Sequence, residues 1–470
     1  MLLSFLSALA LALRLWRLSS CLWFDEVLTL LDFARPPLGA IVTSFPLQNQ
    51  HMLYSILAHV SIRLFGESAW ALRLPAVLFG VGCLWALFLL GRRMLDERQA
   101  LLACALMTVS YHHIWFSQNA RGYTGLLFFA TLATWLWLEA QSRDDWPWWI
   151  IYAMVVFLGM WVQLMMVFVP AAHILIHFTR FVSAPKAKLQ SRWKPAVAWL
   201  LAGSLTLQVY ALALPELLRT GLHEVSLPSE WTSPWWALAE SLRSLSIGLP
   251  GAAAALGGAV LLGAGWWGIL RRDANAAFAI LLPGLLTGVT VLASGHNLWP
   301  RFLFFSMGFA LLIVVHGAMV VARLVLAPIR ATRSNEKLAR GAGVALMGLI
   351  IAASAMTVPR CYALPKQDFT GARDYVERHR RPGEAVVAIG LAGRAYGNYF
   401  APHWLVAQTK EDLDAVRPSD GQVWLVYTLP VEIQAYHPGL WAVVEKDFQI
   451  VKVFPGTLSG GEVTVCRRRL

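Results

Sequence analysis

The chain has 470 residues, of which 57% are hydrophobic and only 14% are charged. Ordinary soluble domains carry about 25% charged residues, so this composition, which includes 22 tryptophans, excludes a soluble protein with a single core. The formal charge of +12 is dispersed in short basic clusters between apolar runs. Such clusters are typical of topology signals beside membrane helices and argue against nucleic acid as a partner. We expect a polytopic α-helical membrane protein.

Apolar runs that can cross a bilayer recur along most of the chain. A bilayer core of about 30 Å requires about 20 apolar helical residues. The first run is interpreted as a retained crossing rather than a cleaved signal, because Arg14 and Arg17 follow it and no basic residue precedes it. The run at 148–182 is too long for one crossing, so we expect a break between Gln163 and Pro170. The prediction is about 11 crossings, from runs near 1–16, 69–90, 100–116, 121–139, 148–182 (two), 196–214, 251–270, 277–293, 302–323 and 341–358.

The linkers between these runs differ in charge. Once the long run is divided, every basic linker falls on one side of the membrane, which the positive-inside bias assigns to the cytoplasm. The basic linkers are 91–99, 141–145, 185–194, 271–273 and 323–340. The segments on the opposite, exoplasmic side are 17–68, the turn near 117–121, the loop 215–250, the turn 294–301 and the tail from 359 on.

Two exoplasmic segments are expected to fold in their own way. Residues 48–66 are apolar but interrupted by histidine and arginine, so they predict an interfacial helix in the first exoplasmic loop rather than a crossing. The tail changes character and is long enough to fold alone. We expect a transmembrane domain, 1–358, followed by a small soluble α/β domain, 359–470.

The tail shows the alternating pattern of an α/β fold. Strand-like stretches at 384–390 and 421–430 are interleaved with helix-like stretches such as 370–381. The five cysteines have no metal-binding spacing. Cys361 and Cys466 both lie in the tail and are candidates for a disulfide in an oxidising compartment.

Charged side chains gather on the exoplasmic side, which the positive-inside bias should leave poor in cations. Each has an ordinary structural explanation when taken singly: a carboxylate at a helix N-terminus, a snorkelling arginine, or a hydrogen-bonded histidine. Together they predict a site for an anion, and arginine pairs bidentately with phosphate. At a membrane surface that phosphate would belong to a lipid. The set comprises Asp25, Glu26, His51, Arg73, Arg121, His296 and Arg301.

Ordered motifs give these residues a family context. The motifs are RLWRL and LWFDEV within 14–27, HMLY at 51–54, RLFG and ALRLPA within 63–76, FSQNARGY at 116–123 and WPRFL at 299–303. As an ordered set, covering about residues 10–320, they resemble the GT-C membrane glycosyltransferases. The nearest groups are the bacterial family 39 enzymes, related to protein O-mannosyltransferases and the aminoarabinose transferase of lipid A. Where the family often has two prolines after the histidine of HMLY, this chain has Met52 and Leu53.

The resemblance implies transfer of a sugar from a polyprenyl-phosphate donor to a hydroxyl of a glycan, lipid or protein acceptor. It places the reaction at the periplasmic face of the bacterial inner membrane. Asp25 is the expected general base of an inverting reaction, and Glu26 would orient it or ligate a cation. Arg121 and Arg301, then Arg73 and Arg17, are the expected ligands of the donor phosphate.

The remaining candidates have supporting roles. His51, His113 and His296 are expected to assist the phosphate, bind a metal or hydrogen-bond the scaffold. Tyr54 and Tyr123 would contact sugar or lipid, or anchor the protein at the interface. A divalent metal, as in some relatives, would have ligands among Glu26, His51 and His296. Aromatic residues at 230–242 are candidates for a cover over the site or, equally, for an interfacial helix without a catalytic part.

Two other classes of protein fit the same composition. A transporter or flippase would move a lipid-linked sugar without chemistry, but its polar groups should line a path near the bilayer midplane rather than gather at one face. A glycan polymerase or ligase has a similar outline and is disfavoured by the order of the motifs. Within the transferase interpretation, the sugar and the acceptor stay open.

Overall fold

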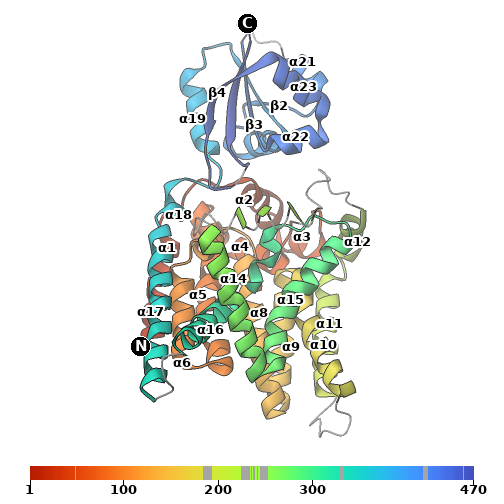
Figure 1. Cartoon of the computed structure of the whole chain (residues 1–470). Coiled ribbons are helices and arrows are strands. Elements are labelled where there is room, and N and C mark those ends of the chain that lie inside the picture. Colours follow the sequence, from red (N-terminus) through yellow and green to blue (C-terminus); the bar gives the residue numbers. More distant parts are fainter. Residues whose placement is uncertain are drawn as a thin grey trace.

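The computed structural model describes residues 1–47, 49–183, 193–223, 233, 235–236, 239–240, 242–243, 252–327, 333–416, 422–458 and 460–469. A large helical part carries a smaller sheet region, residues 359–469, on one end (Figure 1). The expected aromatic cover at 230–242 lies mostly outside the described residues.

Each expected apolar run overlaps a described helix. Five described helices are long and apolar enough to cross a bilayer, or up to six if one bent pair forms a single span. Others, such as the first helix with 14 residues, are shorter than a full crossing. The helices are α1 (Leu2–Leu15), α5 (Ala69–Met94), α6 (Glu97–Thr108), α7 (Tyr111–Ser117), α8 (Tyr123–Arg143), α9 (Trp146–Val162), α10 (Phe168–Ser183), α11 (Lys194–Tyr210), α12 (Leu214–His223), α14 (Ala252–Arg272), α15 (Ala274–Ala293), α16 (Met307–Leu326) and α17 (Arg333–Thr357).

Two runs are broken. The run at 148–182 divides as predicted: α9 ends at Val162, Gln163 is extended, and the 3₁₀ helix η2 (Leu164–Val167) leads into α10. The run at 100–116, expected to be one crossing, is bent by 64° between α6 and α7. A polar group inside the helical part explains this second break.

Arg14 of α1 fills the break between α6 and α7. Its guanidinium is buried and donates to the carbonyl of Met107 at 3.2 Å and that of Thr108 at 3.3 Å. These carbonyls lie at the C-terminal end of α6, where a helix leaves acceptors unpaired and favours a cation. Arg14 also donates to Ser117 in α7, so one side chain holds both sides of the bend.

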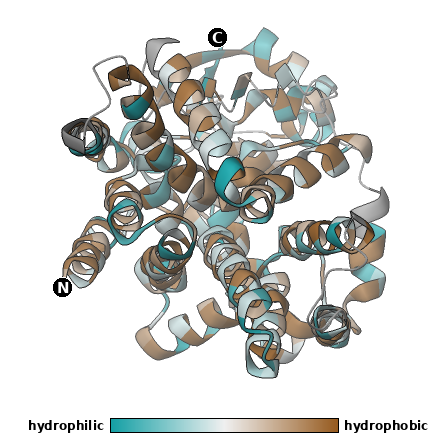
Figure 2. Cartoon of the chain, turned by 60° about the horizontal axis from the view of Figure 1, so that its bottom comes forward, coloured by the Kyte–Doolittle hydropathy of each residue, from teal (hydrophilic) through white to brown (hydrophobic). Residues whose placement is uncertain are grey.

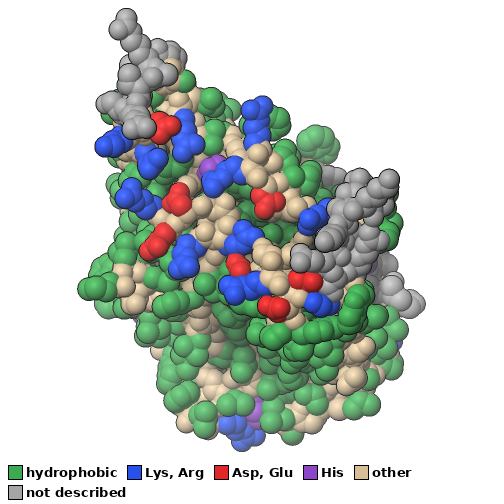
Figure 3. Space-filling model, turned by 90° about the horizontal axis from the view of Figure 1, so that it is seen from below, with side chains coloured by type: hydrophobic (Ala, Val, Ile, Leu, Met, Phe, Trp, Pro, Cys, Tyr) green, Lys and Arg blue, Asp and Glu red, His purple; other side chains and the backbone are tan. Residues whose placement is uncertain are grey.

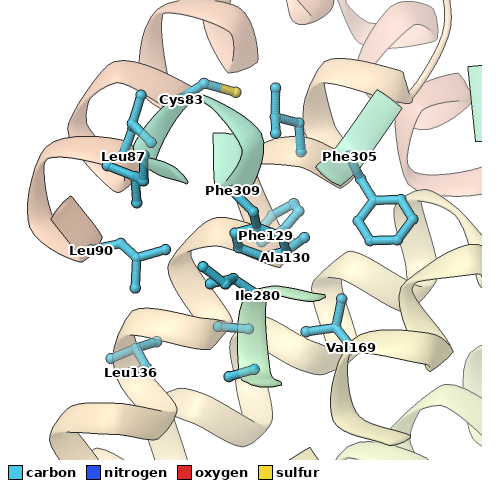
Figure 4. Packing of buried hydrophobic residues seen from close by; sticks show 14 of the residues in the cluster. Cys83, Leu87, Leu90, Phe129, Ala130, Leu136, Val169, Ile280, Phe305 and Phe309 are labelled. Carbon is cyan, nitrogen blue, oxygen red and sulfur yellow. The ribbon is translucent and has the colours of Figure 1, made fainter. Parts of the chain in front are cut away.

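The helical part packs around one extended apolar core. Figure 4 shows side chains from five elements of it, with Leu87 of α5, Phe129 of α8, Val169 of α10, Ile280 of α15 and Phe309 of α16 pointing toward one another. In Figure 2 apolar colour follows the helices and hydrophilic colour gathers at their ends.

Glycines allow α14 and α16 to approach closely. A Cβ at Gly265 would lie 1.9 Å from the carbonyl oxygen of Ile313, and one at Gly317 would lie 2.0 Å from that of Leu261. Small residues at such crossings are a common means of packing helices within membranes.

Charges mark the end of the helical part opposite the sheet region. Figure 3 shows basic and acidic side chains gathered on this face. Arg93 at the end of α5 pairs with Glu139 of α8 at 3.2 Å, and Lys194 at the start of α11 pairs with Asp144 at 3.3 Å. The described parts of these basic linkers therefore lie together.

The sheet region has the expected α/β character. Its strands are β1 (Ala385–Ile389), β2 (Leu405–Ala407), β3 (Val423–Thr428), β4 (Phe448–Phe454) and β5 (Val463–Arg468), in the order β2-β1-β3-β5-β4. The first three are parallel, and β5 and β4 continue the sheet antiparallel. The described helices here are α18 (Arg360–Ala363), α19 (Phe369–His379), α20 (Gly390–Ala395), α21 (Lys410–Asp414), α22 (Pro430–Tyr436) and α23 (Pro438–Asp447), with the π-helix η5 (Tyr396–Phe400).

The candidate disulfide is not formed. Cys466 lies in β5 opposite Leu425, in the sheet's core, whereas Cys361 lies in α18 with its sulfur 3.5 Å from the carbonyl of Tyr111. All five cysteines are free thiols.

The segment between α1 and α5 lies directly beneath the sheet region (Figure 1). It contains α2 (Phe24–Leu28), the π-helix η1 (Thr29–Ala34), α3 (Leu38–Thr43) and α4 (Met52–Phe65), the helix expected at 48–66. Apolar residues of α2, such as Val27, share one buried cluster with Ala392 and Tyr396 of the sheet region. Arg394 and Asp32 form an ion pair of 2.7 Å across the same boundary.

Candidate functional site

Asp25 and Glu26 are neighbours on α2 but have different surroundings. Asp25 is 7% exposed, and its Oδ2 lies 3.5 Å from Nη1 of Arg301. That oxygen accepts no hydrogen bond within the described residues. Asp25 is therefore a buried carboxylate with unused acceptor capacity beside a single cation.

Glu26, in contrast, is saturated. It is fully buried, and its Oε1 accepts from Nε of Arg73 at 2.7 Å and from the backbone N–H of Ala120 at 2.8 Å. Its Oε2 accepts from Nη2 of Arg73 at 2.5 Å and from the N–H of Trp23 at 3.2 Å. Burial alone would raise the pKa of Glu26, but the charges of Arg73 and Lys366 and these hydrogen bonds hold it below its usual value. Glu26 is therefore ionised, and both of its oxygens are occupied by structural hydrogen bonds.

The donors of Arg73 are likewise occupied by structural hydrogen bonds. Beyond Glu26, it donates to the carbonyls of Leu18, Ser20 and Cys21 at 2.7 to 3.0 Å. The pair thus ties α5 to the chain that leads into α2 and to the turn after α7. Its contacts favour a structural role over binding of phosphate.

Arg121 and Arg301 have unused donors. Arg121 is 2% exposed; its Nη2 donates to Asn49 at 3.0 Å, while Nε and Nη1 are buried and have no partner in the described chain. Nε of Arg301 is also buried without a hydrogen-bond partner in the described chain. The guanidinium of Arg301 lies 4.8 Å from the ring centre of Trp299. Buried donors of this kind are costly unless a ligand meets them. The structure therefore brings together Asp25, Arg301 and Arg121 around a place suited to an anion.

His51 supports the turn that carries Arg121. Its Nδ1 accepts the backbone N–H of Gly122 at 2.7 Å, and its ring meets that of Tyr123 edge to face at 5.3 Å. Burial, then the charges of Arg121 and Arg301, lower the pKa of His51 well below its usual value, so the ring is neutral. A Cβ at Gly122 would lie 3.0 Å from Nδ1 of His51 and 2.8 Å from Val162, so only glycine fits there.

The other predicted residues bond to further groups at the same end of the helical part. Tyr54 donates its hydroxyl to the carbonyl of Leu72 at 2.8 Å, and His113 faces Arg14, with Nδ1 at 2.6 Å from Nη2. Arg17 donates to the carbonyl of Tyr362 at 2.6 Å. The ring of His296 lies in the turn after α15, with Nδ1 3.0 Å from the carbonyl oxygen of Ser294.

Several residues of this end were missed in the sequence. Arg14 was interpreted only as a flank of the first run, and Asn49 was given no role. Lys366 and Gln367 were assigned to the tail without a role, because neither belongs to a recognisable motif. Burial lowers the pKa of Lys366 to about 7; the charge of Glu26 acts against this shift, and the charge of Arg73 adds to it.

The predicted metal ligands do not form a metal site. The described residues contain no group of three or more His, Cys, Asp or Glu side chains able to hold an ion. Both oxygens of Glu26 are occupied by donors, and Nδ1 of His51 is occupied by Gly122. These residues do not fit a divalent metal, so no step of the reaction is assigned to one.

An apolar groove of about 430 Å³ opens on the outside of the helical part. It is lined by residues of α4 and α5 and by one side chain of α8. Its lining includes Leu57, Val60, Leu64, Leu78, Phe79 and Phe128. Its chemistry suits a hydrocarbon chain.

The chain combines broken helices at one end, a buried acid that shares this end with two arginines, and an α/β region above them. This is the arrangement of membrane proteins with the GT-C glycosyltransferase fold. Solved structures confirm this fold. ArnT from Cupriavidus metallidurans in the apo state matches with a TM-score of 0.55 and 14% identity over 98% of this chain and 97% of that one. The oligosaccharyltransferase of Archaeoglobus fulgidus matches with a TM-score of 0.57 and 12% identity over 96% of this chain and 72% of that one.

A family model agrees with these structures. Residues 50–213 match the family described as dolichyl-phosphate-mannose-protein mannosyltransferase. The resemblance to GT-C glycosyltransferases is thereby confirmed. Among curated proteins, none matches the sequence. ArnT has also been solved bound to undecaprenyl phosphate, in a structure similar to this one with a TM-score of 0.51, 13% identity and coverage of 98% of this chain and 97% of that one.

Proposed function

We propose that this protein is an inverting glycosyltransferase that moves a sugar from a polyprenyl-phosphate donor to an acceptor hydroxyl. The observation that carries the proposal is the unsatisfied set of buried polar atoms on Asp25, Arg121 and Arg301. A phosphosugar supplies acceptors for the two guanidinium groups, and an acceptor hydroxyl supplies a donor for the carboxylate.

The charges agree with such a donor. Glu26 and Arg73 cancel, so Asp25, Arg121 and Arg301 leave the site with one excess positive charge. The phosphodiester of a polyprenyl-phosphate sugar carries one negative charge and would make the site neutral. Transfer leaves a phosphomonoester that has gained negative charge, and the two arginines stabilise this charge as it develops.

The chemistry follows from these positions. Asp25 accepts the proton of the acceptor hydroxyl as its oxygen forms a bond to the anomeric carbon. The bond from that carbon to the phosphate oxygen breaks, and its electron pair leaves with the phosphate held by Arg121 and Arg301. Attack opposite to the leaving group inverts the anomeric centre.

Charge and fold support an orientation for this site. The end rich in basic residues would face the cytoplasm, with about 11 crossings in residues 1–358, and the domain 359–470 would face the periplasm of a bacterial inner membrane. The prenyl chain would remain in the bilayer, where the apolar groove between α4 and α5 offers it a surface. The undecaprenyl phosphate held by ArnT is a lipid of this chemistry.

The test is transfer of radiolabelled sugar from polyprenyl-phosphate donors in proteoliposomes, with binding of the labelled donor measured separately. Asp25→Asn is expected to lower transfer by about 10²–10⁴-fold, as loss of a general base does, while donor binding persists. Arg121→Met and Arg301→Met are expected to weaken donor binding itself.

Matched controls are Asp374→Asn and Arg35→Met, which remove the same groups from exposed ion pairs. Transfer by Asp25→Asn at the wild-type rate would exclude Asp25 as the base. Donor binding without transfer to any glycan, lipid or protein acceptor would instead support a flippase.

A further inference from the structure

The first backbone N–H of α2 is capped by a residue from the far end of the chain. Phe24, which directly precedes Asp25, donates its N–H to Oε1 of Gln367 at 2.9 Å. The opening N–H groups of a helix have no partner within it, so their acceptors fix how the helix begins. In α2 the other local acceptor is Glu26, which takes the N–H of Trp23.

Gln367 is itself held by the sheet. Its side chain is 0% exposed, and its Nε2 donates to the hydroxyl of Thr428 at 3.0 Å. Thr428 is the last residue of β3 and donates in turn to the carbonyl of Gly461 at 3.2 Å. A continuous chain of hydrogen bonds therefore joins the central strand of the sheet to the helix that carries Asp25.

The neighbouring contacts repeat this connection. Lys366 donates to the carbonyl of Gln118 and lies 5.1 Å over the ring of Trp115, next to the turn of Arg121. In open α/β sheets, ligands bind outside the carboxyl ends of the parallel strands. Here Thr428 marks that edge, and α2 of the same chain lies against it.

We propose that the sheet region is a positioning part of the transfer site, in which Gln367 fixes the direction of α2 and thereby of the Asp25 carboxylate. This inference rests on the proposed function. The amide suits this role because it accepts one hydrogen bond and donates another at the same time. Gln367 touches no substrate in this role and acts through α2.

The test compares Gln367→Met with wild type in the proteoliposome assay. Displacement of reacting groups by about 1 Å can cost about 100-fold in rate, so transfer is expected to fall about 10- to 100-fold. Donor binding should stay within about twofold, since Arg121 and Arg301 lie on other segments. The matched control is Gln422→Met in the same region, where an amide accepts from Arg467 instead.

Gln367→Glu gives a readout that loss of packing would not produce. A protonated carboxyl accepts and donates as the amide does, whereas a carboxylate only accepts. The ratio of variant to wild-type transfer should therefore rise as the pH falls. Thr428→Val, which breaks the same chain from the sheet side, should lower transfer in the same direction and serves as the test if Gln367→Met fails to fold.

The outcomes separate the two proposals. A wild-type protein without transfer would overturn the proposed function. Loss of transfer in Asp25→Asn, with unchanged rates in Gln367→Met and Thr428→Val, would overturn the positioning role alone. A pH-independent ratio for Gln367→Glu would also count against it.

Discussion

The buried pair of Glu26 and Arg73 offers a direct test of the site's construction. If Glu26 is a structural anchor, Glu26→Gln should destabilise the whole fold. A metal ligand or a catalytic group would affect activity alone. The variant keeps the shape of the side chain but removes its charge, so Arg73 becomes an uncompensated buried cation.

The magnitude follows from the contacts. Glu26 accepts from four donors, two on Arg73 and one each on Ala120 and Trp23. An amide has only one acceptor oxygen, and its NH₂ would face donors. Breaking one side of a buried ion pair costs about 3–5 kcal/mol. The control, Glu67→Gln, breaks the exposed pair with Arg35 and should cost about 1 kcal/mol or less.

The assay is thermal unfolding of the purified protein in detergent. Glu26→Gln should lower the melting temperature by about 5 °C or more, and Glu67→Gln much less. The double variant Glu26→Gln/Arg73→Met should lose about 1–3 kcal/mol less unfolding free energy than the two single variants lose together. The reason is that removal of both partners leaves no buried charge unpaired. A melting temperature for Glu26→Gln equal to that of Glu67→Gln would refute the reasoning.

Two further predictions concern buried cations. The pKa of Lys366 is lowered to about 7 from 10.5, so between these values the unfolded chain binds more protons than the folded one and stability should rise with pH. The melting temperature of wild type relative to Lys366→Met, measured from pH 7 to 10, should show that rise, and a flat difference would contradict it. Arg14→Met leaves the carbonyls of Met107 and Thr108 without their donor, at about 1–3 kcal/mol each. Hydrogen exchange at 109–122 should quicken in this variant, and exchange at the wild-type rate would show that Arg14 does not hold the bend.

The helices were predictable because their signal is local. A bilayer demands long apolar runs, and the break near Gln163 follows from the length of one such run alone. The bend between α6 and α7 was not predictable in this way. It depends on Arg14, which is about 94 residues away from the carbonyl it binds, and no pattern within residues 100–116 contains that information.

The site was predictable in part. Asp25, Arg121 and Arg301 were grouped by motif order and by charge on one face, and the structure does bring them together. Their division of labour was not visible, because Glu26 differs from Asp25 only through partners on α5 and in the turn before Arg121. Gln367 carries no charge and belongs to no motif, so only its two hydrogen bonds identify it.

The three groups of the site share one physical feature, which is that each lies where regular helix stops. Asp25 is on the five-residue α2, which continues directly into the π-helix η1. Arg121 lies four residues after α7 ends at Ser117, and Arg301 is the second residue of the seven-residue 3₁₀ helix η4 (Pro300–Ser306). Long 3₁₀ segments are uncommon, and irregular backbone at membrane depth persists only where protein or a polar cavity surrounds it. Because all three segments depart from regular helix at the same end, their side chains can converge on one place, and the tertiary anchors Arg14, Glu26 and Gln367 are what keep those departures fixed.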